Sequence, residues 1–169
     1  MRAWWMFSLL LCVAPSVPGA GADPSLLEHP SVKLMLDGKP SDIFDRAALA
    51  LMPRGTAQGA PNGEPSSTWQ GVALEDIVRR TCVASGDSLS GRALARLVRV
   101  TAANGEQVVF SATELDPDFG NVEVLLADTR DGHPLAQDGP FRLIVPKDKR
   151  SDRWLSHVTT IEVVDASTP

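Results

Sequence analysis

The sequence contains no tyrosine, and all aromatic residues together make up only 5% of its 169 residues. Aromatic platforms that stack on bases or sugars are therefore not expected. Basic residues are also in the minority, because 16 Lys and Arg face 21 Asp and Glu and give a formal charge of −5. No basic stripe interrupts this balance, which argues against nucleic acid as a partner. The 13 glycines and 13 prolines instead predict a chain with many turns.

The N-terminus has the layout of a secretory signal peptide. The positive residue Arg2 precedes an uncharged apolar run of 11 residues at 3–13, and prolines and the small residues Ala20-Gly21-Ala22 follow. This run is shorter than the ~20 residues that cross a bilayer, although an uncleaved anchor is the alternative. We expect a signal peptide at 1–22 and a mature chain at 23–169 that is periplasmic or secreted. No other run is long enough to give the mature chain a membrane span.

Cysteine is too rare for an internal disulfide in the mature chain. Cleavage would remove Cys12 and Arg2, leave Cys82 alone and bring the formal charge to −6. The hydrophobic core must then hold the fold, and 147 residues are enough for one. Cys82 recurs with the apolar residues of a predicted helix, so a packed thiol is the favoured interpretation. A reactive or metal-binding Cys82 is the alternative.

Hydrophobic patterning predicts a β-rich α+β domain. Alternating or short apolar segments predict six strands, at 32–36, 97–101, 107–110, 122–127, 141–145 and 158–164. Asn104-Gly105 predicts a type I′ hairpin between two of these strands. Helices are expected at 44–51, capped by Asp42 or Asp45, and at 74–83, which Trp69-Gln70-Gly71-Val72 would open.

Two further segments have local signals. Ser111 followed by Glu114 forms a capping box and predicts one turn of helix. The segment 54–67 is rich in Gly, Pro and small polar residues, so it is expected to be a long loop, either functional or disordered.

Several motifs in a fixed order resemble one family of domains. These motifs are Trp69-Gln70-Gly71-Val72-Ala73-Leu74, the hairpin at Asn104-Gly105, the short acidic helix after it, Leu125-Leu126-Ala127, Asp131-Gly132-His133-Pro134-Leu135, Gly139-Pro140-Phe141-Arg142-Leu143-Ile144-Val145-Pro146, and Trp154 with Ile161-Glu162-Val163. Together they resemble the oxidoreductase molybdopterin-binding domain of the sulfite oxidase superfamily over about 32–164. The chain is most similar to the short, stand-alone exported members. The resemblance implies the sulfite oxidase molybdopterin-binding fold.

The resemblance also implies a ligand set and one departure from it. Family enzymes hold molybdenum through a cysteine thiolate in the loop before the W-x-G-V element, and the corresponding loop at 54–68 contains no cysteine. The pterin-lining positions of the family fall on Thr101 and Arg142, and Asp138 lies near a position that is often polar. Arg153 belongs to a basic group that would enlarge the pocket or form an ordinary solvated loop; its other members are Lys147, Lys149 and Arg150. A buried Arg142 needs an anion, either a phosphate-bearing ligand or a carboxylate such as Asp138.

No metal-binding or nucleophilic motif accompanies these residues. His29, His133 and His157 lie far apart and lack metal-ligand spacing. The segment 116–121 resembles a calcium loop, but its Gly and Asn are in swapped order and the final Glu is missing. Nucleotide-binding and serine-hydrolase fingerprints are absent as well.

Three functions remain open at this point. The first is an exported molybdopterin-domain-like binding module without thiolate-held molybdenum, which takes a small anionic or pterin ligand. The second is a molybdopterin-dependent oxidoreductase, or its redox subunit, that binds the cofactor without the usual cysteine. The third is a protein-interaction or sensor-accessory domain with a protein partner in the exported compartment.

Overall fold

Two β-sheets organise the protein in the computed structural model, which describes residues 30–61, 63–84 and 90–167. The first sheet has the strand order β2-β1-β10-β5-β6, and the second has the order β3-β4-β7-β8 with β9 also paired to β7. The strands of the first sheet are β1 (Ser31–Leu36), β2 (Lys39–Asp45), β5 (Arg96–Ala102), β6 (Gln107–Ser111) and β10 (Val158–Asp165). Those of the second are β3 (Arg54–Gly59), β4 (Ser67–Ala73), β7 (Leu125–Arg130), β8 (His133–Pro134) and β9 (Arg142–Ile144). The β-rich character expected from the sequence is confirmed.

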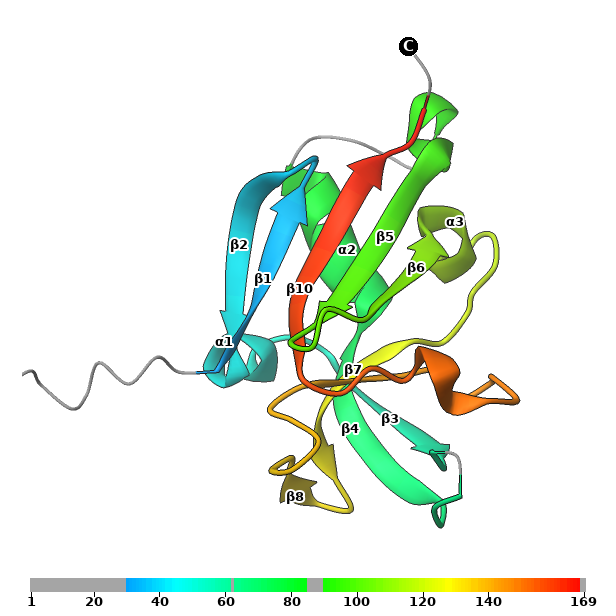
Figure 1. Ribbon diagram of the computed structural model, residues 1–169. Helices are drawn as coiled ribbons and strands as arrows, with labels where there is room; N and C mark the ends of the chain where they lie inside the picture. The colour runs from blue at the N-terminus through cyan, green and yellow to red at the C-terminus, as the bar shows by residue number, and fades with distance from the viewer. Residues whose placement is uncertain (1–29, 62, 85–89, 168–169) are drawn as a thin grey trace, which may run out of the picture.

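Short helices join and cover the sheets. They are α1 (Arg46–Ala50), α2 (Leu74–Ala84) and α3 (Ala112–Leu115), with the 3-10 turns η2 (Gly91–Ala95) and η3 (Ser151–Arg153). Figure 1 shows α2 lying along one face of the first sheet, while β3 and β4 extend below that sheet in the view. Among the described residues, no helix is both long and apolar enough to cross a membrane.

The hydrophobic core lies between the first sheet, α2 and the inner part of the second sheet. Alternation in β1 turns Val32 and Leu34 inward, and both are completely buried or nearly so. Leu74 and Ile77 of α2 are fully buried in the same core. Cys82 lies in α2, but its side chain lies outside the described part of the chain, so its packing stays a prediction.

Only part of the segment 54–67 lies outside strands, contrary to the sequence-based prediction of one long loop. Its first half is β3, which pairs antiparallel with β4 from Arg54 opposite Val72 to Gly59 opposite Ser67. Trp69 therefore belongs to a strand and does not open α2. Small residues within the segment allow close packing: a Cβ added to Gly59 of β3 would lie 2.5 Å from the ring of Trp154.

Other predictions are right in position and wrong in detail. The hairpin between β5 and β6 is confirmed, but only Gly105 of its turn is left-handed, with φ of 86°, and its N–H donates to the carbonyl of Ala102. This is a type I turn followed by a glycine bulge, and not a type I′ turn. The helix expected at 44–51 begins at Arg46 with Asp45 as its cap, because Phe44 still belongs to strand β2.

The remaining elements were predicted to different degrees. Ser111 caps α3, and its Oγ accepts from the N–H of Glu114 at 2.9 Å as expected. The strand predicted at 122–127 is shifted to 125–130, and β2, β3, β4 and β8 were not predicted. The strands at 32–36, 97–101, 107–110 and 158–164 are confirmed, and the prediction at 141–145 is confirmed for 142–144.

Candidate functional site

A buried tryptophan forms the base of the most polar cluster on the second sheet. The sequence places Trp69 in the centre of β4, where it is fully buried and its Nε1 donates to the carbonyl of Gly59 at 3.1 Å. Trp154 packs edge-on against it, with ring centroids 6.0 Å apart. Two guanidinium groups lie over the Trp69 ring, that of Arg130 at 4.8 Å from the centroid and that of Arg142 at 5.4 Å. Such cation–π contacts strengthen when they are shielded from water.

Arg142 is the more buried of the two arginines. It begins β9, which pairs with β7 through Arg142 opposite Ala127, and only 9% of the residue is exposed. Its Nη1 forms an ion pair with Oδ2 of Asp138 at 2.8 Å, so one of the two anionic partners expected for Arg142, a carboxylate of the protein, is present in the structure. Its Nε is also buried, and no atom of the described residues accepts a hydrogen bond from it. An unsatisfied buried donor is uncommon and calls for a physical reason.

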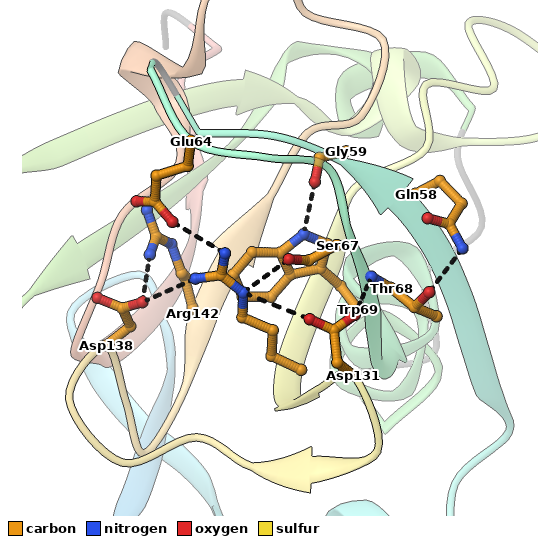
Figure 2. A network of polar contacts seen from close by, with 10 residues as sticks. Gln58, Gly59, Glu64, Ser67, Thr68, Trp69, Asp131, Asp138 and Arg142 are labelled. Atoms are coloured by element: carbon orange, nitrogen blue, oxygen red, sulfur yellow. Dashed lines mark hydrogen bonds and ion pairs between the residues drawn. The ribbon is translucent and has the colours of Figure 1, made fainter.

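Arg130 lies at the end of β7 and is fixed on several sides. Its Nε donates to Ser67 Oγ at 2.9 Å and its Nη2 to Glu64 at 2.9 Å. The remaining nitrogen, Nη1, lies 3.7 Å from Oδ2 of Asp138, which is longer than a hydrogen bond. Oδ2 of Asp131 lies 3.9 Å from Nε of Arg130. Both arginines therefore converge on one oxygen atom of Asp138 (Figure 2).

An open cleft of about 310 Å³ is lined by Arg130 and by Asp138, the ion-pair partner of Arg142. Its described lining is formed by Arg130, Asp131 and residues 133–138, from the β7–β8 hairpin and the segment after it. Asp131 has a left-handed backbone, with φ of 50°, and its Oδ1 accepts from the N–H of Thr68 at 2.8 Å. That hydrogen bond, helped by Ser67 and Arg130, lowers the pKa of Asp131. Its carboxylate is therefore ionised at neutral pH.

A second ion pair, between Arg54 and Asp128, lies on the same sheet as this cluster. Asp128 on β7 is buried and accepts two hydrogen bonds from Arg54 of β3, at 2.6 and 2.8 Å. Arg46 of α1 donates to the carbonyl oxygens of Asp128, Leu135 and Pro140, at 3.0, 3.1 and 3.3 Å. These contacts hold both ends of the segment that carries Asp138.

The other predicted site residues lie elsewhere. Thr101 is on β5 of the first sheet, where its Oγ1 accepts from Gln107 at 3.1 Å. Arg153 is in η3 and is paired with Asp148 at 2.7 Å and Glu114 at 3.2 Å. The hydrogen bonds that it donates to these two carboxylates raise its pKa, against the lowering effect of burial. Of the four residues predicted to bind a cofactor, the structure brings together only Asp138 and Arg142.

The basic group after β9 is dispersed in the same way. Lys147 is exposed and lines a separate cleft of about 300 Å³. Lys149 is exposed as well, and Arg150 is exposed and pairs with Asp152 at 2.7 Å. These side chains do not join Arg142 in one basic pocket. The interpretation as a solvated, charge-paired loop describes their arrangement better.

The residues do not fit a molybdopterin cofactor held in the manner of the family. Thr101 and Arg142 lie on different sheets, and the guanidinium of Arg153 is taken by two carboxylates. The segment that should supply a thiolate is the β3–β4 hairpin, which has no cysteine. Within the described ranges, no group of three His, Cys, Asp or Glu residues is placed to hold a metal ion. His29 lies outside the described residues.

Arg130 is the main residue that sequence reasoning missed. It reaches Arg142 only because β7 pairs with both β4 and β9, and this pairing is not encoded in local sequence. The only signal was an arginine directly after the apolar run of β7, next to a turn residue. No family model and no curated protein matches the chain.

Proposed function

We propose that the mature chain is an exported, non-enzymatic binding module without thiolate-held molybdenum, which takes a small ligand with an oxyanion group at Arg130 and Arg142. The observation that carries this proposal is the pair of guanidinium groups fixed over Trp69 and aimed at one oxygen position beside the cleft. Guanidinium groups bind carboxylate and phosphate oxygens with strong, charge-assisted hydrogen bonds. A rigid aromatic support keeps the donors in place before the ligand arrives.

Burial supports a role in binding as well. A buried arginine is costly to retain for stability alone, since hydrophobic replacements of buried ion pairs are often neutral or stabilising. Arg142 is retained with one donor unsatisfied, and its partner Asp138 lines a cleft whose size lies at the lower end of the range for small-molecule sites. The location outside the cytoplasm rests on the predicted signal peptide at 1–22, and intact-mass measurement of the exported protein would find a start near Asp23.

The proposal is tested by titrating the isotope-labelled protein with inorganic phosphate and with acetate, while the NMR signals of the arginine Nε–Hε groups are recorded. We expect a saturable shift at Arg142 and Arg130. Arg142→Lys keeps the charge and removes the bidentate geometry, so it should weaken binding at least about tenfold. Arg150→Lys, at an exposed position outside the cluster, is the matched control and should bind like the parent. No saturable shift with either anion, or equal binding by Arg142→Lys, would refute the proposal.

A further inference from the structure

We propose that the carboxylate of Asp138 is an internal substitute for the ligand's oxyanion, and that the ligand binds by displacing it from Arg142 and Arg130. This inference rests on the proposed function. It adds that the Asp138 carboxylate fills the site when no ligand is bound, and that an oxyanion group of the ligand replaces it. The group is an oxyanion, from either a carboxylate or a phosphate. Figure 2 shows Asp138 beside Arg142 at the edge of the cluster.

Asp138 occupies the position where the two cationic groups meet. A single atom, Oδ2, lies 2.8 Å from Nη1 of Arg142 and 3.7 Å from Nη1 of Arg130. The contact to Arg142 is a close ion pair, whereas the contact to Arg130 is longer than a hydrogen bond, so Arg130 is left with an incompletely used donor on the side of the cleft. Asp138 thus neutralises the arginines without saturating their hydrogen-bonding capacity.

The orphan donor of Arg142 points to the same conclusion. The side chain is nine-tenths buried, and its Nε has no acceptor among the described residues while its Nη1 is bound to Asp138. The bidentate edge of a guanidinium group uses two nitrogens and two acceptor oxygens. An oxyanion with two or more available oxygens can bridge Nη1 of Arg142 and Nη1 of Arg130 without moving either guanidinium. One oxygen of Asp138 cannot serve all three donors.

The arginines are fixed more firmly than the carboxylate. Arg130 is held by Ser67, Glu64 and the Trp69 ring, and Arg142 is held by burial and by the same ring. Asp138 lies outside the strands, lines the cleft, and leaves 38% of its side chain exposed. Its backbone carbonyl accepts from His157 N–H at 3.3 Å, and Arg46 anchors the ends of the segment. Rotation of the Asp138 side chain into solvent is therefore enough to vacate the position.

The charges around the site oppose an anion as long as Asp138 remains. Two arginines face three carboxylates, those of Glu64, Asp131 and Asp138. When Asp138 turns away, the incoming oxyanion takes over its charge next to the arginines, and the local balance is restored. The free protein should consequently bind simple anions weakly, and removal of the internal carboxylate should strengthen binding.

The experiment compares the parent protein with Asp138→Asn in titrations with inorganic phosphate and acetate, each followed by calorimetry and by the Nε–Hε signal of Arg142. Loss of a competing charged hydrogen bond should raise anion affinity by about 10- to 100-fold. Asp152→Asn removes the same charge at an exposed pair and is the matched control, which should change affinity less than about twofold. Tighter binding of phosphate identifies a phosphoryl ligand, and tighter binding of acetate identifies a carboxylate.

Other outcomes separate this inference from the proposed function. Equal affinity of Asp138→Asn and the parent, with clear binding in both, would overturn the displacement and leave the binding site intact. No binding by either protein would refute the proposed function itself. If Asp138→Asn does not fold, Asp138→Ser serves as the second variant, with the same expected gain. The double variant Asp138→Asn with Arg142→Lys should lose the gain in anion affinity, because the guanidinium group that binds the anion is gone.

Discussion

The ion pair between Arg54 and Asp128 should be the most important polar contact for the stability of the second sheet. Asp128 is 5% exposed, and both of its oxygens accept from Arg54, at 2.8 and 2.6 Å. Thr129 Oγ1 also donates to Oδ1 at 2.8 Å. Burial alone would raise the pKa of Asp128, but these hydrogen bonds and the charges of Arg54 and Arg46 outweigh burial and lower it. The folded protein therefore favours the ionised carboxylate.

Asp128→Asn should destabilise the protein by about 2–3 kcal/mol. Breaking a buried ion pair costs about 3–5 kcal/mol, because the remaining charge is left without compensation. The side chain of Arg54 is 35% exposed, so part of its charge returns to water and the cost is reduced accordingly. For a domain of this size, the change corresponds to about 5–10 °C in melting temperature. Urea denaturation of the variant and the parent measures the difference, with Asp152→Asn as an exposed control that stays within about 0.5 kcal/mol.

The pH dependence provides a second measurement of the same pair. Because the folded-state pKa of Asp128 is lowered, the ionised carboxylate contributes its full stability above the pKa of about 3.9 in the unfolded chain. This contribution is lost as the pH falls from there through the lower pKa of the folded state. The gap in stability between parent and Asp128→Asn should therefore narrow below about pH 4. A gap that stays constant down to pH 2, or a variant as stable as the parent at pH 7, would refute the reasoning.

Two further substitutions test local features of the fold. Asp45→Ala should cost about 1 kcal/mol in urea denaturation, because the Asp45 carboxylate caps α1 by accepting from Ala48 N–H at 2.7 Å; no measurable change would mean that the cap is not formed. Gly71→Ala should abolish the cooperative thermal transition or lower its midpoint by more than about 10 °C, since the new Cβ would meet the Leu126 carbonyl at 2.0 Å. Gly63→Ala is its control: that glycine has open space around it, and its φ of 80° should cost only about 1 kcal/mol. Similar effects of the two glycine variants would contradict the packing argument.

The fold was predictable where strands bury one full side. β1, β5 and β10 alternate between buried and partly exposed residues, and this alternation is legible in the sequence. β2 buries only Phe44, and β3 buries only Ala57. Both are edge strands of their sheets, so their hydrogen bonds come from one neighbour and their side chains face solvent. Because these edge strands bury few side chains, their sequences show no hydrophobic alternation that would predict a strand. Their glycine and proline residues suggest a loop instead.

The candidate site was predictable to the extent that its residues are close in sequence. Arg142 and Asp138 are four residues apart, and their pairing was one of two alternatives that charge burial required. Arg130 and Trp69 join them through the register of β4, β7 and β9, which brings residues up to 73 positions apart into contact. Thr101 came from the family resemblance and Arg153 from the basic group that follows Arg142, and in the structure each has its own partners in another part of the molecule.

The two buried ion pairs of the second sheet differ in how completely they are satisfied. The carboxylate of Asp128 uses both oxygens on Arg54 and also accepts from Thr129, which is the arrangement of a structural contact. The pair of Arg142 and Asp138 has one short ion pair, one long ion pair to Arg130, and a buried Nε without an acceptor among the described residues. A fold that satisfies one buried arginine pair so fully has no evident stability reason to leave the neighbouring one incomplete. The incomplete pair also borders the cleft through Asp138, and our proposal that a ligand completes the site accounts for the unused donors.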